Sequence, residues 1–149
     1  MADEFGRLVV LSGNIGAGKT LLAERLSDRL GWQIGNEAVS HNAYLSDYYG
    51  DPARWAFHLA VHNLELRLRQ LIELKRCGQS VVLDRSIYED RYVFVEAQRE
   101  LGLLSERDYR CYLSLWELLF EKIPVPDALI YLHVPVGVLL NRIRARGRV

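Results

Sequence analysis

The stretch GNIGAGKT at residues 13–20 follows a short apolar run and opens an amphipathic segment. It fits the pattern G-x-x-x-x-G-K-[ST], in which backbone N–H groups converge on phosphate oxygens at the start of a helix. The run RLVVLS at residues 7–12 predicts a buried strand, and Leu22, Leu26 and Leu30 recur at helical spacing afterwards. A glycine turn that only joins strand to helix is the alternative, and the complete motif in this context disfavours it. The sequence therefore predicts a loop that binds a nucleoside triphosphate, which we expect to be ATP.

The positions of this loop differ in their chemistry. Lys19 is expected to reach the β- and γ-phosphates, and the Thr20 hydroxyl is expected to bind Mg²⁺. The motif by itself does not separate a kinase from an ATPase or a GTPase. The residues that we expect to bind ATP are Gly13, Asn14, Ile15, Gly16, Ala17, Gly18, Lys19 and Thr20.

Beyond the loop, apolar runs alternate with helical patterns. Periodicity predicts helices over about 18–30, 52–77, 88–101, 106–123 and 136–146, and strands over 32–37, 80–83 and 128–134. Ser105, with Asp108 three residues later, is typical of a helix N-terminus. Because the strands are apolar on both faces, the pattern predicts an α/β fold with a parallel sheet flanked by helices.

Nothing in the composition divides the chain into separate domains. Repeats, linkers and low-complexity tracts are absent from the sequence, so we expect a single domain over residues 1–149. The sequence stops after RARGRV, where a domain of this class usually continues with another strand and helix. We therefore expect the C-terminal end of the domain to be incomplete.

The charge balance and the cysteines restrict the environment of the protein. Acidic and basic residues number 19 each, so no basic excess supports a nucleic-acid partner. The acidic start MADEFGRL does not match a secretion signal, and no apolar run approaches the roughly 18 residues of a membrane span. Cys77 and Cys111 are isolated, which predicts two buried free thiols rather than a disulfide. We expect a cytoplasmic protein that binds neither nucleic acid nor membrane.

Charged residues follow two of the predicted strands. Glu37 ends the second strand, and Asp84, Arg85 and Ser86 follow the third. Ligands of parallel sheets gather at the carboxyl ends of strands. An acid that deprotonates a hydroxyl and an arginine that balances charge suit phosphoryl transfer. The alternative is an ion pair on the surface at the end of a strand. Because these charged residues occur together with the phosphate loop, we favour the functional interpretation.

Five motifs occur in order along nearly the whole chain: GNIGAGKT, YYGDPARWAF, LDRSIYEDRYVF, PDALIYLHVP and RIRARGR. With them the sequence resembles the deoxynucleoside kinase family, above all its bacterial deoxyadenosine/deoxyguanosine kinases, with deoxycytidine kinase more distant. The motif LDRSIYEDRYVF is far more discriminating than the phosphate loop. The resemblance implies a P-loop kinase with a five-stranded parallel sheet, which transfers the ATP γ-phosphate to the 5′-hydroxyl of a deoxynucleoside in nucleotide salvage.

The resemblance also implies roles for matching positions. Glu37 matches the general base on the 5′-hydroxyl, and Arg85 matches the arginine that contacts the 5′ end. Asp84 matches the acid that lies towards the phosphates and Mg²⁺. Tyr49 matches the tyrosine that bonds the 3′-hydroxyl, and Phe94 matches the aromatic residue that stacks on the base.

Two further matches concern the choice of base. Arg67 and Asp90 match the arginine and the acid that face adenine, guanine or cytosine in this family, which disfavours thymidine. A purine deoxynucleoside is expected, deoxyadenosine first, with deoxyguanosine or deoxycytidine as alternatives. One departure is Ala60, where the family usually carries a glutamine that bonds the base. Our hypothesis is that Asn63, one helical turn further along, or a water molecule replaces the lost amide.

Arginines recur near the end of the chain, at Arg142, Arg144, Arg146 and Arg148. A solvated basic helix end is one interpretation, because cations suit helix C-termini. The resemblance favours a lid whose arginines Arg142, Arg144 and Arg146 stabilise charge on the transferring phosphoryl group. Arg148 fits this role less well.

Other functions remain as alternatives. A nucleoside monophosphate kinase of the thymidylate type shares the loop and the lid, although Tyr49 and Glu37 suggest a neutral sugar as acceptor. A non-catalytic nucleotide-binding subunit is suggested by Ala60 and by the end of the sequence. A switch-type GTPase is disfavoured because no N-K-x-D motif occurs. The helix predicted over residues 106–123, rich in Leu and Trp, suggests a homodimer or a heterodimer with a related subunit.

Overall fold

The computed structural model describes residues 6–35 and 42–147. The chain divides into two compact units, each of which is built from segments that are distant in the sequence. We call them the sheet unit, Met1–Glu37, Leu74–Ser86 and Pro126–Val149, and the helical unit, Ala38–Glu73 and Ile87–Val125.

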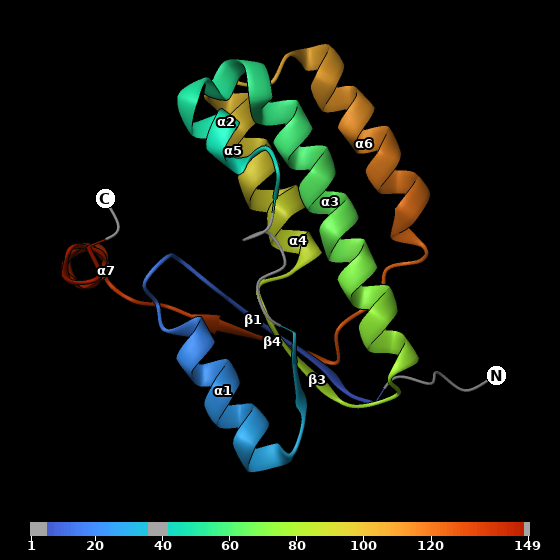
Figure 1. Ribbon diagram of the computed structural model, residues 1–149, viewed down its shortest axis with the longest axis vertical. Coiled ribbons are helices and arrows are strands. Elements are labelled where there is room, and N and C mark those ends of the chain that lie inside the picture. The colour runs from blue at the N-terminus through green and yellow to red at the C-terminus, as the bar shows by residue number, and fades with distance from the viewer. Residues whose placement is uncertain (1–5, 36–41, 148–149) are drawn as a thin grey trace. The chain divides into compact units, whose positions relative to one another are not determined.

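The sheet unit contains four parallel strands, which confirms the predicted α/β architecture. The strands are β1 (Leu8–Gly13), β2 (Gln33–Gly35), β3 (Val81–Asp84) and β4 (Ala128–Leu132). Their order in the sheet is β2-β3-β1-β4. Figure 1 labels β1, β3 and β4 together with the helices α1 and α7 of this unit. Helix α1 (Lys19–Leu30) connects β1 to β2, and helix α7 (Val136–Ala145) follows β4.

The core of the sheet unit lies between α1 and the strands. Leu11 of β1, Ala23 of α1 and Val82 of β3 are almost completely buried in one cluster. Leu22 and Leu26 of the predicted apolar stripe pack against that cluster. Packing of Leu22 and Leu26 fixes the face of α1 that meets the sheet, whereas Leu30, the last leucine of the predicted stripe, is 48% exposed.

Two expectations about burial are wrong. Strand β4 forms, but it is the edge strand of the described sheet, and Leu129 and Tyr131 are 56% and 61% exposed. Apolar composition predicts burial on both faces, whereas β4 has a neighbouring strand, β1, on one side only, so fewer side chains surround it and four of its five residues are exposed. The sequence also predicts buried thiols at Cys77 and Cys111, and both residues are exposed.

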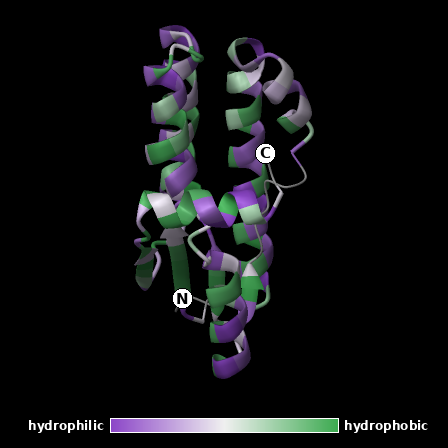
Figure 2. Cartoon of the chain, turned by 90° about the vertical axis from the view of Figure 1, so that its left-hand side faces the viewer, coloured by the Kyte–Doolittle hydropathy of each residue, from purple (hydrophilic) through white to green (hydrophobic). Residues whose placement is uncertain are grey.

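The described part of the helical unit contains helices and no strand. Hydrophilic and hydrophobic residues alternate along these helices, as amphipathic packing requires (Figure 2). Ser105 accepts a hydrogen bond from the Asp108 N–H at 3.1 Å, which confirms the predicted helix start. The helices are α2 (Leu45–Gly50), α3 (Pro52–Arg76), α4 (Ile87–Glu89), η2 (Asp90–Val95), α5 (Glu96–Glu100) and α6 (Glu106–Phe120).

The segment predicted as one helix over residues 88–101 is helical but not regular. Its middle part, η2, is a π-helix that separates the α-helical pieces α4 and α5. Elsewhere, no helix within residues 6–35 or 42–147 combines the length and the apolar character that crossing a bilayer requires.

Candidate active site

The sheet topology brings the phosphate loop next to the residues that follow β3. Strands β1 and β3 are parallel neighbours, with Leu11 in register with Asp84. The Arg85 N–H donates to the Leu11 carbonyl at 3.0 Å, so the pairing continues to the end of the strand. The phosphate loop and the residues after β3 therefore leave the sheet at the same end, the carboxyl end of the parallel strands.

Two glycines of the loop meet requirements that no other residue meets. Gly13 has φ +147°, and a Cβ atom there would lie 2.8 Å from the Leu132 carbonyl oxygen. Gly18 has φ +100° at the residue that precedes α1. Side chains are strained at such positive φ values. The glycines thus allow the backbone to turn tightly from strand to helix.

The Lys19 side chain folds back onto the phosphate loop. Its Nζ donates to the carbonyl oxygens of Gly13 at 2.8 Å and Asn14 at 2.9 Å, and the residue is buried. The ammonium group is therefore held at the loop by neutral acceptors. A phosphate oxygen is a stronger, charge-assisted acceptor for the same group.

Thr20 and Asp84 bring two side-chain oxygen atoms together. The Thr20 hydroxyl donates to Asp84 Oδ2 at 2.5 Å across 64 positions of sequence. Asp84 is 4% exposed, and its Oδ1 atom is buried with no hydrogen-bond partner. Hydroxyl and carboxylate oxygens are ligands that Mg²⁺ prefers, so the two residues fit the predicted metal site.

Arg85 has an unusual backbone conformation. Its φ of +69° is the only positive value at a non-glycine residue within the described part of the chain. Such a conformation costs of order 1–3 kcal/mol, and strain of this kind clusters at functional sites. The turn sends the chain sharply away from the end of β3, and no local pattern in the sequence indicates it.

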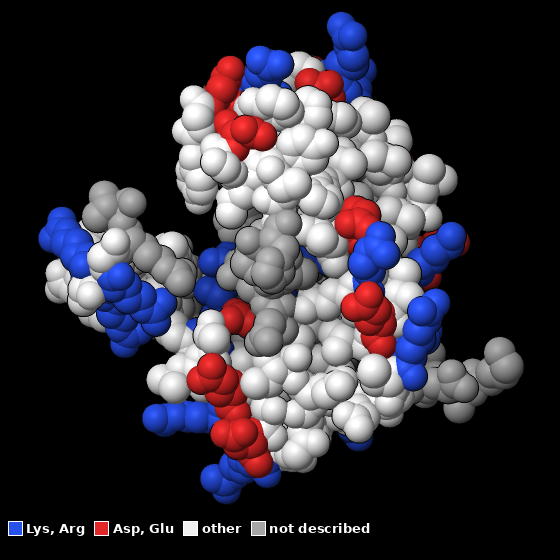
Figure 3. All heavy atoms as spheres, in the orientation of Figure 1, with Lys and Arg blue, Asp and Glu red and all other residues white. Residues whose placement is uncertain are grey.

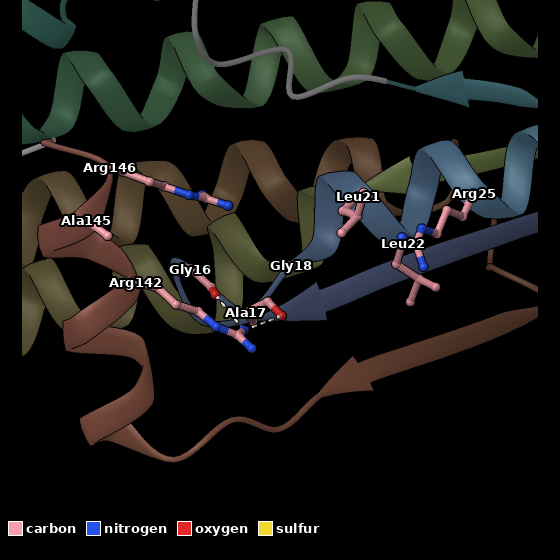
Figure 4. A pocket seen from close by; sticks show the side chains of 9 residues that line it. All are labelled: Gly16, Ala17, Gly18, Leu21, Leu22, Arg25, Arg142, Ala145 and Arg146. Atoms are coloured by element: carbon pink, nitrogen blue, oxygen red, sulfur yellow. Dashed lines mark hydrogen bonds between the residues drawn. The ribbon is translucent and has the colours of Figure 1, made fainter.

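Helix α7 brings arginines to the other side of the loop. Arg142 Nη1 donates to the carbonyl oxygens of Gly16 at 3.1 Å and Ala17 at 3.4 Å, as the dashed lines in Figure 4 show. In the space-filling view the basic side chains of this region gather over α7 (Figure 3). These hydrogen bonds hold Arg142 against the backbone of the phosphate loop.

A pocket of about 590 Å³ opens between α1 and α7. Figure 4 shows Arg142 and Arg146 entering it from the α7 side. Arg144 is exposed and is not among the lining residues. Sequence reasoning missed Leu21 and Arg25, although their place just after the loop on α1 was a usable signal. The lining residues are Gly16, Ala17, Gly18, Leu21, Leu22, Arg25, Arg142, Ala145 and Arg146.

A second group of predicted residues lies in the helical unit. Arg67 Nε, from α3, donates to Asp90 Oδ2, from η2, at 3.0 Å. The two side chains are only 3% and 6% exposed. Both terminal nitrogens of Arg67 are buried without a hydrogen-bond partner. Buried N–H groups left without partners are costly, and a ligand that accepts from them removes that cost.

Asn63 is held by a residue that the sequence did not single out. Asn42 is buried, and its Nδ2 donates to Asn63 Oδ1 at 2.6 Å and to the Leu59 carbonyl at 3.2 Å. Its Oδ1 accepts from the Tyr44 N–H at 2.8 Å and lies 3.0 Å from His62 Nδ1. Because an amide oxygen only accepts, His62 Nδ1 is the donor. The role of Asn63 towards a base stays a prediction.

The other predicted acceptor residues lie on the surface or outside the described residues. Tyr49 on α2 is 76% exposed, and Phe94 in η2 is 42% exposed. Glu37 lies outside the described residues. The structure thus gathers the predicted nucleotide residues in the sheet unit, and it brings Arg67 and Asp90 together in the helical unit.

Comparison with known proteins connects both groups to one family. A sequence profile described as "Deoxynucleoside kinase" matches residues 9–149. The deoxyadenosine/deoxycytidine kinase of Bacillus subtilis is 39% identical over 143 residues, which cover 95% of this chain and 66% of that protein. The deoxyadenosine kinase of Dictyostelium discoideum is also 39% identical, and 58% of it is covered.

Solved structures give the same result for the fold. A deoxyadenosine kinase from M. mycoides, solved with the products dCMP and a flexible dCDP, superposes with a TM-score of 0.83 at 29% identity. The match covers 95% of this chain and 71% of that one, so the fold is that of a P-loop kinase. The chain spans less than two thirds of the length of the curated relatives named above. By its sequence and its fold, the chain belongs to the deoxynucleoside kinase family.

Proposed function

We propose that this protein is an ATP-dependent deoxynucleoside kinase, whose acceptor is the 5′-hydroxyl of a purine deoxynucleoside. Deoxyadenosine is the favoured acceptor, with deoxyguanosine or deoxycytidine as alternatives. Relatives named as deoxyadenosine/deoxycytidine and deoxyguanosine kinases support this range of bases. Deoxynucleoside phosphorylation would serve nucleotide salvage in the cytoplasm.

The observation that carries the proposal is the buried pair of Arg67 and Asp90. A carboxylate and a guanidinium side by side offer an acceptor and donors to the polar edge of a base. Two unpartnered nitrogens on Arg67 are available for that purpose. A P-loop ATPase without an acceptor has no need of such a pair in a separate helical unit.

The sheet unit supplies the residues for the phosphate donor. We assign the loop residues from Gly13 to Thr20 to the phosphates, with Lys19 on the β- and γ-phosphates. Arg142 and Arg146 line the adjoining pocket, and Arg85 follows β3. Their positive charges stabilise the charge that spreads over the transferring phosphoryl group.

Thr20 and Asp84 are proposed to hold Mg²⁺. The Thr20 hydroxyl oxygen and Asp84 Oδ2 are 2.5 Å apart, and Asp84 Oδ1 has no hydrogen-bond partner. Asp84 Oδ1 is therefore available as a ligand for the cation. Mg²⁺ bound there supplies neutralisation of the phosphate oxygens. The carboxylate accepts the Thr20 hydroxyl hydrogen, which leaves the lone pairs of the hydroxyl oxygen for a cation.

The chemical step is an in-line displacement. The 5′-oxygen of the deoxynucleoside forms a bond to the γ-phosphorus while the bond from that phosphorus to the β,γ-bridging oxygen breaks. ADP leaves with the electron pair of the broken bond, and the hydroxyl proton passes to Glu37 as general base. We assign Tyr49 to the sugar and Phe94 to the base. Asn63 is assigned to the edge of the base with which Ala60 cannot form a hydrogen bond.

We further propose that the protein is a homodimer, or a heterodimer with a related subunit. Helix α6 supports this assembly because it exposes large apolar side chains. Leu118 is 74% exposed and Phe120 is 46% exposed on this helix. Sedimentation of the wild type beside Leu118→Lys tests it, since a charge in an apolar interface weakens association.

Calorimetry of nucleoside binding tests the proposed function. Deoxyadenosine, deoxyguanosine, deoxycytidine and thymidine are titrated beside their 5′-monophosphates. We expect saturable binding of a purine deoxynucleoside that is tighter than binding of its monophosphate. Tyr49→Phe should weaken deoxynucleoside binding roughly 3- to 10-fold by removing one hydrogen bond. The neighbouring Tyr48→Phe is the matched control.

Each other outcome supports a different function. Tighter binding of a monophosphate would assign the protein to the monophosphate kinases. Binding of ATP with no nucleoside or monophosphate would assign it to the non-catalytic subunits. Tyr49→Phe without any effect, beside intact nucleoside binding, would remove Tyr49 from the site while leaving the kinase activity in place.

A further inference from the structure

The helical segment after β3 contains a π-turn at the proposed acceptor site. Residues Asp90–Val95 form η2, and the α-helix resumes at Glu96. Single π-turns within α-helices are rare and are found frequently at functional sites. This one begins at Asp90 and includes Phe94, two residues that the proposed function assigns to the deoxynucleoside.

An ion pair spans the π-turn at an unusual spacing. Arg91 Nη1 is bonded to Glu96 Oε1, five residues further along. In an α-helix, residues five apart point about 140° away from each other, and ion pairs form at spacings of three or four. The wider π-turn brings positions i and i+5 onto the same side. The pair therefore favours the π-turn over a regular α-helix.

Glu96 is held from a second helix as well. The Tyr109 hydroxyl of α6 donates to the same Oε1 atom at 2.6 Å. Tyr109 is buried, and the Arg91 guanidinium lies 5.9 Å from the centre of its ring. The Tyr109 hydrogen bond is the main cause that lowers the pKa of Glu96, with Arg91 contributing in the same direction. Glu96 is thus a charged anchor between η2 and α6.

The anchor matters because Asp90 needs one orientation. Asp90 Oδ2 accepts from Arg67 Nε inside the helical unit, where both side chains are almost completely buried. A π-turn contains one residue more than a turn of α-helix. If η2 became α-helical, the residues before it would rotate by about 100° around the helix axis relative to the residues after it. Such a rotation would turn the Asp90 carboxylate away from Arg67.

We propose that Glu96, acting through Arg91 and Tyr109, is a positioning residue of the acceptor site. It holds the π-turn that presents Asp90 to Arg67 and keeps Phe94 at its place. Glu96 itself does not contact the deoxynucleoside in this scheme. The assignment of Asp90 and Phe94 to the acceptor rests on the proposed function, whereas the π-turn and the contacts of Glu96 are features of the fold.

The test compares Glu96→Gln with a matched variant on the same two helices. The glutamine side chain is close in shape to glutamate and still accepts from Tyr109, but it offers no charge to Arg91. The control is Glu106→Gln, because Glu106 of α6 pairs with Arg99 of α5 outside the π-turn. Steady-state kinetics and amide hydrogen exchange of the peptide covering residues 90–96 are measured for both.

We expect Glu96→Gln to raise the KM for deoxynucleoside roughly 10- to 100-fold, as misplaced site residues do, while the KM for ATP changes by less than about twofold. Amide exchange over residues 90–96 should accelerate in the same variant. Glu106→Gln should match the wild type in both measurements. The exchanged pair Arg91→Glu/Glu96→Arg should recover much of the loss, which a general packing defect would not allow.

The outcomes separate the two proposals. If Glu96→Gln matches Glu106→Gln in hydrogen exchange and in deoxynucleoside KM, the positioning role is wrong. A wild type that binds no deoxynucleoside removes the proposed function, and hydrogen exchange alone then decides whether Glu96 holds the π-turn. Should Glu96→Gln fail to fold, Tyr109→Phe provides the milder change, with the same direction expected in exchange.

Discussion

At the scale of single residues, Arg67 is a charged side chain buried at the proposed acceptor site. Its guanidinium and the Asp90 carboxylate are both withdrawn from water, with one hydrogen bond between them. Desolvating two charges is expensive, and one ion pair with unsatisfied donors compensates it poorly. The proposed binding of a polar base would give the two unpartnered nitrogens of Arg67 an acceptor.

Arg67→Met should therefore destabilise the protein by about 3–5 kcal/mol, because it removes the guanidinium that compensates the buried Asp90 carboxylate. The double variant Arg67→Met/Asp90→Leu should recover most of this loss, since it removes both buried charges. Urea unfolding of the wild type, the single variant and the double variant gives the comparison. A single variant as stable as the wild type would mean that water reaches Asp90.

Asp84 provides a second prediction at this scale. Asp84→Asn keeps the size of the side chain but removes the negative charge beside Thr20. We expect the Mg²⁺ concentration that gives half-maximal ATP phosphoryl transfer to rise on the order of tenfold or more. Thr20→Ser, which keeps a hydroxyl, should stay close to the wild type. Equal Mg²⁺ dependence of the wild type and Asp84→Asn would exclude Asp84 from the metal site.

At the scale of elements, local pattern predicted most of the structure. The strand before the phosphate loop, the packing of Leu22 and Leu26 on α1 and the cap at Ser105 all formed because each depends on neighbours in the sequence. The π-turn of η2 was not predicted, because it depends on Glu96 meeting Tyr109 from another helix. The exposure of β4 was not predicted either, since composition does not tell an edge strand from a central one.

The candidate site divides in the same way. Lys19 and Thr20 follow from the loop motif, and adjacency of β1 to β3 brings Asp84 to Thr20. The backbone strain at Arg85 and the four contacts of Asn42 depend on tertiary structure, so no spacing in the sequence indicates them. Arg67 and Asp90 were predicted as partners of a base, and the structure adds that they are partners of each other.

The cap of α6 gives a prediction for an element whose start the sequence identified. Ser105→Ala removes the side-chain acceptor of the Asp108 N–H and should cost about 1 kcal/mol of stability. Ser114→Ala, an exposed change inside the same helix, should alter stability by less than about 0.5 kcal/mol. Thermal unfolding of both variants provides the measurement, and equal effects of the two would contradict the capping role.

The anchor between η2 and α6 predicts a pH dependence. The pKa of Glu96 is lowered from its ordinary value of 4.5, first by the Tyr109 hydrogen bond. A lowered pKa in the folded state means that the unfolded state binds the proton more tightly, so stability is lost as pH falls below that ordinary value. Glu96→Gln should therefore show a flatter decline of unfolding free energy on the acid side. A parallel decline in both proteins would contradict the charged anchor.

At the scale of the whole molecule, the residues proposed for the chemistry are divided between the two compact units. The phosphate loop, Asp84 and the arginines of α7 all belong to the sheet unit, whereas Arg67, Asp90 and Phe94 belong to the helical unit. Each unit is assembled from separate segments of chain, and α3 runs from the helical unit into the sheet unit. Donor and acceptor should therefore leave separable signatures on the backbone.

Hydrogen exchange with each ligand alone can resolve these signatures. A non-hydrolysable ATP analogue with Mg²⁺ should slow exchange in peptides that cover residues 13–20 and 136–146. Deoxyadenosine should slow exchange in peptides that cover residues 63–67 and 90–95. Binding stabilises the segments that a ligand contacts, and local opening reports that stabilisation segment by segment.

Arg67→Met sharpens this last prediction. The variant should lose the protection given by deoxyadenosine while keeping the protection given by the ATP analogue, because only the acceptor residues have changed. Peptides over residues 26–32, which carry none of the assigned residues and none of the anchor residues, are the internal reference. Deoxyadenosine protection confined to the phosphate loop would mean that the nucleoside occupies the donor site, and the assignment of the helical unit to the acceptor would then be wrong.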